Sequence, residues 1–407
     1  MKKKILAYIF DGYFSNHKYV HGNLISSISK EFSRVIFIDL TFLKLNINLN
    51  NQVQNKNLFI PKTYNELDLF LSKNEVISFV SLGTGYEYFK ILRLLKKRNV
   101  KLIQNMSIGY NKQNEIFEIK KKIQQKLQFF IFRFLVFINY FPKIELIFEG
   151  SKENISKMNK QLGRKIDRIF PFLNFAYIKK IEHINCRAYD TYLSNLKDLS
   201  EKYIVFLDGG FDHPDVQLYE KKQNSTNRKI YYSYLKKILN KLSKIYDKKV
   251  IFCAHPKVNE KKIKTFFKDA KIKIVQYKTQ YYILRAFMVV MHESSTTFDA
   301  IILKKRILNL NSILMGNYYY NRNKFYPKRI KIPSFEMENY KEIRRVDIDK
   351  YFENKESLYD NYLKNFVKDV KSYKLIYFNK LKKSKYTKFN NLPGTTQMIK
   401  IIKKKFF

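Results

Sequence analysis

Short apolar runs recur along this chain, and most of them end in a polar or glycine-containing cluster followed by a segment with helical spacing. Runs of this length predict buried strands, and the segments between them predict helices. Such alternation is typical of parallel sheets covered by helices on both faces, with ligands held at the carboxyl ends of the strands. The runs lie at 5–10, 35–38, 76–82, 101–104, 144–148, 203–207, 250–254, 272–275, 287–291 and 306–310.

The chain has 407 residues, which is more than one ordinary core accommodates. The alternation therefore predicts an α/β protein of two Rossmann-like, doubly wound domains. We expect a first domain over 1–175, a connector over 176–202, a second domain over 203–340 and a helical, basic tail over 341–407.

Two segments combine cations with large apolar side chains. The stretch 124–141 is rich in Phe, Ile and Leu and predicts an amphipathic helix, which either packs within a domain or lies on a bilayer. The end of the tail carries Lys403, Lys404 and Lys405 before Phe406 and Phe407. This pattern favours attraction to an anionic membrane surface, and the alternative is a packed or solvated helix.

The net charge of +44, from 79 Lys and Arg against 35 Asp and Glu, must attract an anionic partner. Nucleic acid, anionic lipid and acidic sugars all qualify, and charge alone does not choose among them because the basic residues are spread along the chain. The two cysteines exclude a disulfide scaffold, and no apolar run is long enough to span a membrane. We therefore expect a cytoplasmic protein on the inner face of the plasma membrane.

Three polar motifs follow strand-like runs of the second half: Asp208-Gly209-Gly210, His255-Pro256 and Ser294-Ser295. Because parallel strands end at one edge of a sheet, these motifs are expected to converge on one ligand. Singly, each has an ordinary structural interpretation, since a strand-end Asp-Gly is usually a turn and serines before a helix usually cap it. Their joint appearance in this order favours a functional site.

Inverting glycosyl transfer needs a base for the acceptor hydroxyl and stabilisation of a departing phosphate. We expect Asp208 to be the base and His255 to donate to the leaving phosphate. Around them, glycines allow close approach, a proline fixes the chain direction, and hydroxyls at a helix start hold phosphate without a metal. These candidates for binding the donor are Gly209, Gly210, Pro256, His292, Glu293, Ser294, Ser295 and Thr296.

The first half offers fewer candidates. Asp11-Gly12 ends the first strand-like run and is a candidate for contact with the acceptor. Gly83-Thr84-Gly85 lacks the third glycine of a dinucleotide fingerprint and is interpreted as a tight turn. No His, Cys and Asp spacing is typical of a metal site, so neither a metal nor a cofactor is expected.

The second half, over about 203–311, resembles bacterial sialyltransferases, polysialyltransferases and capsule Kdo transferases, which share an acidic-Gly motif, a His-Pro motif and a Ser-Ser/Thr motif. The resemblance implies a GT-B fold and a CMP-activated sugar as co-substrate. It also implies that Asp208 is the general base, His255 the general acid at the donor phosphate, and Ser294 with Ser295 the hydroxyls that bind CMP.

The resemblance has departures. The second acidic residue often found before the glycine is missing at 207–209, and Lys304-Lys305 stands where such proteins often have a glycine. In addition, the stretch from Ser294 through Phe298-Asp299 is similar to the Ser-Ser…Phe-Asp signature of CDP-glycerol glycerophosphotransferases, which build teichoic acid chains. Both resemblances imply a cytidine nucleotide donor.

The sequence therefore leaves three hypotheses. The first is transfer of a sialic, nonulosonic or Kdo-type sugar to a glycan or glycolipid acceptor of a capsule or lipopolysaccharide. The second is transfer of glycerol phosphate in teichoic-acid-like polymer synthesis. The third, a non-enzymatic nucleic-acid-binding protein, ranks lowest because it would leave the ordered motifs without a role and no nucleic-acid-binding module is recognisable.

Overall fold

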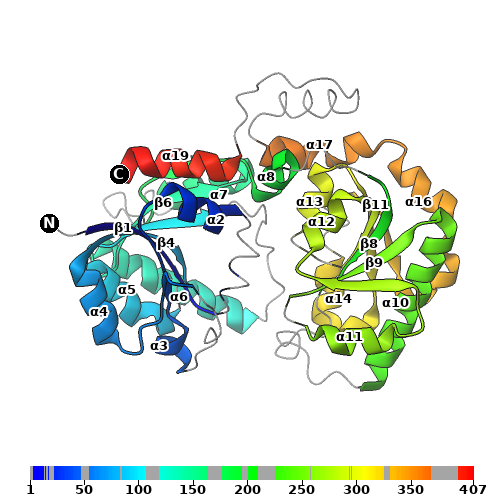
Figure 1. Cartoon of the computed structure of the whole chain (residues 1–407), viewed down its shortest axis with the longest axis horizontal. Coiled ribbons are helices and arrows are strands. Elements are labelled where there is room, and N and C mark those ends of the chain that lie inside the picture. Colours follow the sequence, from blue (N-terminus) through cyan, green and yellow to red (C-terminus); the bar gives the residue numbers. More distant parts are fainter. Residues whose placement is uncertain are drawn as a thin grey trace.

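The computed structural model describes residues 3–12, 14, 17, 23–46, 55–82, 85–106, 119–163, 177–194, 200–209, 225–256, 258–292, 294, 296–324, 331–367 and 393–407. It contains two parallel sheets, one of seven strands and one of six. Figure 1 shows the two α/β domains side by side, with the last helix of the chain lying over the first domain.

The first domain alternates strands and helices from its first strand onward. Its elements are β1 (Lys3–Phe10), α2 (Asn23–Glu31), β2 (Val35–Asp39), α3 (Thr41–Leu45), β3 (Leu58–Phe59), α4 (Tyr64–Lys73), β4 (Asn74–Ser81), the 3-10 turn η1 (Tyr86–Tyr88), α5 (Phe89–Lys97), β5 (Lys101–Met106), α6 (Ile119–Phe137), β6 (Ile144–Glu149), α7 (Lys152–Gly163) and β7 (Ile181–His183).

The strands of this sheet run in the order β3-β2-β1-β4-β5-β6-β7, and every neighbouring pair is parallel. Both faces are covered because successive strand residues point to opposite sides. In β1, Leu6 and Tyr8 belong to the core on the side of α2, whereas Ala7 and Ile9 belong to the core on the side of α4 and α5.

The second domain repeats this plan after a connecting helix, α8 (Arg187–Ser194). Its elements are β8 (Tyr203–Leu207), α10 (Ser225–Tyr246), β9 (Lys249–Ala254), α11 (Glu260–Phe266), β10 (Ile272–Gln276), α12 (Thr279–Leu284), β11 (Ala286–Met291), α13 (Thr297–Ile302), β12 (Arg306–Asn311), η2 (Ile313–Met315), α14 (Asn317–Asn323), β13 (Ser334–Glu336), η3 (Met337–Glu342), α16 (Arg345–Phe352) and α17 (Lys355–Phe366); the chain ends with α19 (Gly394–Phe406).

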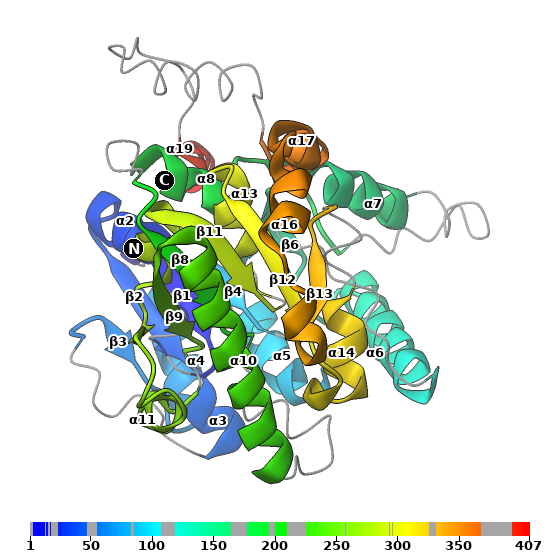
Figure 2. The ribbon, with the colours of Figure 1, turned by 90° about the vertical axis from the view of Figure 1, so that its right-hand side faces the viewer.

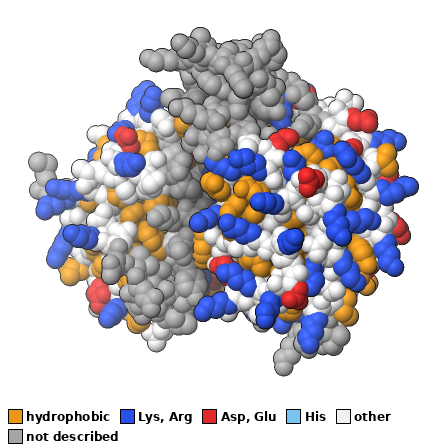
Figure 3. Space-filling view, turned by 45° about the vertical axis from the view of Figure 1, so that its right-hand side comes forward, with side chains coloured by type: hydrophobic (Ala, Val, Ile, Leu, Met, Phe, Trp, Pro, Cys, Tyr) orange, Lys and Arg blue, Asp and Glu red, His pale blue; other side chains and the backbone are white. Residues whose placement is uncertain are grey.

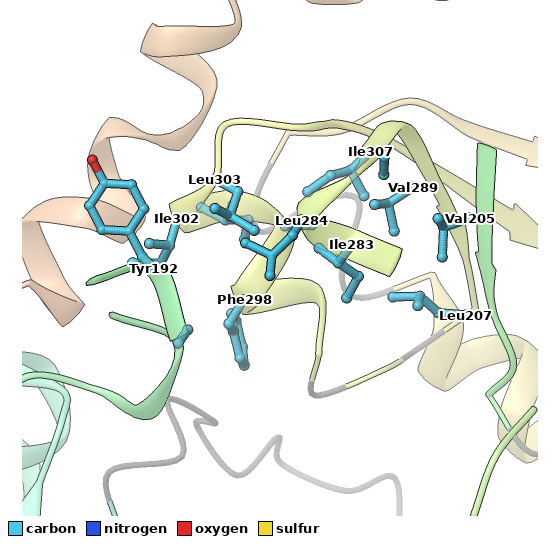
Figure 4. Close-up of a cluster of buried hydrophobic side chains, with 14 of the residues drawn as sticks. Tyr192, Val205, Leu207, Ile283, Leu284, Val289, Phe298, Ile302, Leu303 and Ile307 are labelled. Carbon is cyan, nitrogen blue, oxygen red and sulfur yellow. The ribbon is translucent and has the colours of Figure 1, made fainter. Parts of the chain in front are cut away.

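The second sheet has the order β10-β9-β8-β11-β12-β13, again with parallel pairs throughout. Figure 2 shows α10 crossing one face of this sheet, where Ile204 and Phe206 of β8 are buried. Val205 and Leu207 point to the opposite face, into the cluster drawn in Figure 4 with Val289 and Ile283.

Two doubly wound sheets, which share one strand order except that the first has β7 in addition, confirm the predicted fold class, a two-domain α/β protein of the GT-B type. All ten apolar runs lie in strands, and the stretch predicted as an amphipathic helix overlaps α6. The sequence did not indicate the edge strands β3, β7 and β13, which are two or three residues long and mostly half-buried. Strands this short at the edge of a sheet bury few side chains, so they do not require the apolar run by which the other strands were predicted.

The packing divides the chain differently from the predicted boundaries. The first sheet extends past residue 175 to include β7, and α16 and α17 bury side chains such as Ile348 and Leu363 in the second domain. Helix α19 buries Met398, Ile399 and Ile402 in the first domain. The segment predicted as a separate tail therefore contributes to both cores, and the apolar face of α19 is occupied by protein.

Candidate functional site

The three motifs of the second half lie at neighbouring strand ends. Asp208 follows β8, His255 follows β9, and Ser294 comes soon after the end of β11. These strands are adjacent in the order β9-β8-β11, with Leu207 in register with both Cys253 and Met291. From β8 the strand order runs to β9 and β10 on one side and to β11, β12 and β13 on the other. The point between β8 and β11 is therefore a topological switch point, where open α/β sheets hold ligands. The structure thus brings the predicted motifs to one place.

Asp208 is joined to the His-Pro motif by hydrogen bonds. Its backbone N–H donates to the carbonyl of Cys253 at 3.1 Å, and its Oδ2 accepts the backbone N–H of His255 at 3.1 Å. Asp208 is 6% exposed, whereas Gly209, His255 and Pro256 are partly exposed. A carboxylate and a partly exposed histidine held at adjacent strand ends suit proton transfer at a bound ligand.

Gln276, at the end of β10, fixes the turn that carries His255 and was not indicated by the sequence. Its Nε2 donates to the carbonyl oxygens of His255 at 2.9 Å, Val258 at 3.1 Å and Pro256 at 3.3 Å. The hydroxyl of Tyr277 donates to the carbonyl of Pro256 at 3.1 Å. These bonds tie the carbonyl groups around His255 to the neighbouring strand, so Gln276 is a positioning residue for the motif.

His292 occupies a different position from the one predicted. Its ring is fully buried, with Nδ1 2.8 Å from the carbonyl oxygen of Leu310 and Nε2 hydrogen-bonded to the hydroxyl of Tyr231. Burial lowers the pKa of His292 to about 4, so the ring is neutral at pH 7. Because both nitrogens are engaged inside the domain, His292 supports the strand end rather than contacting a donor.

The hydroxyl motif lies at the start of α13. Ser294 Oγ is 2.8 Å from Thr296 Oγ1 and accepts the backbone N–H of Thr296 at 3.3 Å, while Thr297 donates its N–H to the carbonyl of Ser294. Ser294 is partly exposed and Thr296 is buried. Of the predicted donor contacts, Gly210, Glu293 and Ser295 lie outside the described residues.

Phe298 and Asp299, which extend the hydroxyl motif, pack inward. The ring of Phe298 stacks on Tyr362 with centroids 4.9 Å apart. Asp299 Oδ2 forms an ion pair with Arg187 Nη2 at 3.1 Å, and both side chains are buried. These two residues therefore anchor α13 to α17 and α8. Further along, Lys304 has a φ of 49°, a left-handed conformation that glycine adopts most easily.

At the corresponding edge of the first sheet, Asp11 belongs to a polar cluster. Asp11 Oδ2 is 2.8 Å from Lys44 Nζ and accepts the hydroxyl hydrogen of Tyr88 at 2.7 Å. Partial burial acts to lower the pKa of Lys44, but hydrogen bonds with Asp11 and Tyr88 outweigh it and the pKa is raised. Gly12 has a φ of 92° and donates its N–H to Thr41 Oγ1 at 2.7 Å. The charge of Asp11 is thus paired with that of Lys44.

A pocket of about 320 Å³ opens at the carboxyl ends of the central strands of the first sheet. Gly83 and Thr84, which follow β4, lie outside the described residues. The pocket is lined by Tyr8, Phe79, Val80, Ser81, Leu82, Gln104, Asn105 and Met106. The lining residues of β5, Gln104 and Asn105, were not indicated by the sequence because they sit within an ordinary strand pattern.

Among the described residues, no group of three or more His, Cys, Asp or Glu side chains is placed to hold a metal ion. On the face seen in Figure 3, Lys and Arg side chains are spread over the surface rather than gathered in one patch.

No family model matches the chain, and no curated protein matches it. Among solved structures, it is similar to the UDP-GlcNAc 2-epimerase of Methanocaldococcus jannaschii, with 14% identity over 98% of this chain and 99% of that one and a TM-score of 0.48. The wall teichoic acid polymerase TagF gives 14% identity over 95% and 91%, with a TM-score of 0.47.

The calicheamicin glycosyltransferase CalG4 gives 5% identity over 99% and 98% of the two chains, with a TM-score of 0.48. At TM-scores below 0.5 these likenesses carry no argument about this chain. Its fold class rests on its own strand order.

Proposed function

We propose that this protein is an inverting, metal-independent glycosyltransferase that moves a sialic, nonulosonic or Kdo-type sugar from a CMP donor to a bacterial surface glycan of a capsule or lipopolysaccharide. The observation that carries the proposal is the meeting of Asp208, His255 and Ser294 at adjacent strand ends of the second sheet. The switch point of such a sheet is the general place for a nucleotide.

In the proposed reaction, the carboxylate of Asp208 removes the proton of the acceptor hydroxyl as that oxygen attacks the anomeric carbon of the sugar. The bond from this carbon to the phosphate oxygen of CMP breaks at the same time, and the imidazole of His255 donates a hydrogen bond or a proton to the departing phosphate. The Ser294 hydroxyl, which is partly exposed, donates a hydrogen bond to that phosphate.

Glycerophosphate transfer from CDP-glycerol is the second candidate, favoured by the Ser-Ser…Phe-Asp signature. Its last two residues, Phe298 and Asp299, are the ones that the structure holds between α8 and α17. A common donor nucleotide fits both candidates, because each reaction releases CMP.

The deciding experiment incubates the full chain with CMP-sialic acid, CMP-Kdo and CDP-glycerol separately and measures free CMP. Release from a CMP-sugar alone supports the first proposal, and release from CDP-glycerol alone supports the second. Thermal unfolding with added CMP gives an independent readout, since a ligand that binds only the folded state raises its stability. No CMP release together with no thermal protection by CMP would overturn both candidates, and protection by an oligonucleotide alone would favour nucleic-acid binding.

A further inference from the structure

Helix α6 exposes an apolar face as well as burying one. Phe132 and Val136 are buried against the first sheet. On the other side, large apolar side chains recur at spacings of three and four residues, which places them along one face of the helix. They are Leu127 (55% exposed), Phe130 (54%), Phe134 (44%) and Phe137 (36%), and Ile138 and Tyr140 continue the exposed set just beyond the helix.

This apolar face differs from the other exposed apolar side chains of the described residues. Leu69, Ile313 and Val346, for example, belong to three separate elements, as isolated surface apolar residues usually do. A contiguous exposed row of this kind marks a surface that contacts something apolar. Figure 2 shows α6 at one side of the molecule.

The charge on and around α6 identifies what it contacts. The helix sequence contains Lys120, Lys121, Lys122, Lys126 and Arg133 and no Asp or Glu. At its end, the guanidinium of Arg93 lies 5.0 Å from the ring centroid of Tyr140. A helix whose sequence is basic throughout and which exposes a row of Phe and Leu matches a surface that is anionic outside and apolar beneath, which is a bilayer containing acidic lipids.

We propose that the exposed face of α6 docks the protein on an anionic lipid bilayer, with the helix lying in the plane of the headgroups. Phe130, Phe134 and Phe137 enter the boundary between headgroups and acyl chains. Within the described part of the chain, none of the helices combines the length and the hydropathy that spanning a bilayer requires. The proposal does not depend on the identity of the donor.

Binding to vesicles tests this surface with the full chain and no nucleotide. The Phe130→Ser/Phe134→Ser variant is expected to bind vesicles of phosphatidylcholine and phosphatidylglycerol at least about tenfold more weakly than the unaltered chain. The matched control is Ile313→Ser/Val346→Ser, which removes two apolar side chains of 63% and 64% exposure from the second domain and is expected to bind normally. Equal binding by the Phe variant, or no binding by the unaltered chain, would overturn the proposal.

A spectroscopic measurement covers the case in which the double variant fails to fold. The chain contains no tryptophan, so Phe134→Trp introduces a single tryptophan on the exposed face, which can be excited selectively over the tyrosines. Its emission is expected to shift to the blue when anionic vesicles are added, while Ile313→Trp shows no shift. No shift at position 134, or a shift with oligonucleotide or with rising protein concentration in place of lipid, would refute the bilayer contact and indicate another occupant.

Discussion

The carboxylate of Asp208 accepts the backbone N–H of His255 at 3.1 Å, which joins two motif residues separated by 47 positions in the chain. The bond crosses from the end of β8 to the end of β9, the neighbouring strand. The Asp208 carboxylate is therefore both the acceptor of this structural hydrogen bond and the proposed base. A substitution that keeps the hydrogen bond but removes the base tells these two roles apart.

Asp208→Asn makes this separation, because the amide oxygen still accepts the N–H of His255 but is not a base. We expect turnover to fall by about 10²–10⁴-fold, the usual contribution of general acid–base catalysis, while the melting temperature and CMP binding stay near those of the unaltered chain. Asp208→Ala removes the acceptor as well and is expected to cost a further 1–3 kcal/mol of stability, approximately. Full turnover by the Asn variant would exclude Asp208 as the base.

The buried pair of Arg187 and Asp299 ties α8 to α13 and is expected to respond strongly to loss of one partner. Arg187→Met or Asp299→Asn should each reduce the free energy of unfolding by about 3–5 kcal/mol, because the remaining polar group stays buried without its counterpart. Arg187→Met combined with Asp299→Leu should recover part of this loss. The exposed pair of Glu260 and Lys264 is the control, and Lys264→Ala should cost less than about 1 kcal/mol in urea unfolding. Equal effects at the two pairs would contradict the buried role.

Glu149, at the end of β6, predicts a pH dependence of stability. Burial raises the pKa of its carboxyl to about 7; Oε1 accepts the N–H of Ser151 at 2.9 Å, and Oε2 has no hydrogen-bond partner among the described residues. The folded protein therefore holds a proton that the unfolded chain releases near its ordinary pKa of about 4.3. Between these two values the unfolded state binds fewer protons, so this residue makes stability fall as pH rises to about 7.

Glu149→Gln should remove this dependence, because the amide does not titrate. We expect the variant to match the unaltered chain near pH 4.5 and to exceed it at pH 8 by up to about 3 kcal/mol, measured by denaturant unfolding across that range. His292 acts in the opposite direction, because its lowered pKa makes stability fall on acidification. This contribution is the same in the Glu149 variant and in the unaltered chain, so it cancels when their free energies of unfolding are subtracted. A constant difference at all pH values would show that Glu149 does not change its protonation on unfolding.

The sequence predicts features that depend on neighbouring residues in the chain, and it misses those that depend on contacts between distant elements. Runs such as 203–207 and 250–254 are strands because their own apolar residues fill both faces of a parallel sheet, and their order places Asp208 beside His255. The burial of His292 depends on Tyr231 and Leu310, which come from other elements and leave no local signal. In α6 both faces are apolar, so spacing alone did not separate the buried side from the exposed one.

The position of α19 could not be predicted from the sequence either, because Thr395 at its start bonds to Asp190, which lies 205 residues earlier in the chain. The Asp190 carboxylate in α8 accepts the N–H of Thr395 at 2.9 Å, and it also accepts the N–H of Gly394 at the start of α19. A side chain at the position of Gly394 would place its Cβ 2.0 Å from the backbone carbonyl oxygen of Asn185. Glycine at this position therefore allows the start of α19 to lie directly against the backbone of Asn185.

Gly394→Ala is expected to displace the start of α19, because a backbone oxygen cannot move aside as a side chain can. Overpacking of this kind costs about 1–3 kcal/mol, and we expect amide hydrogen exchange to rise along 394–406 together with a lower melting temperature. Lys400→Ala, an exposed change on the same helix, is the control and should leave both readouts unchanged. Because α8 contacts both α19 and α13, the displacement should also loosen the connection between the domains. Unaltered exchange along α19 in the Gly394 variant would show that the helix tolerates the extra methyl group and docks by other contacts.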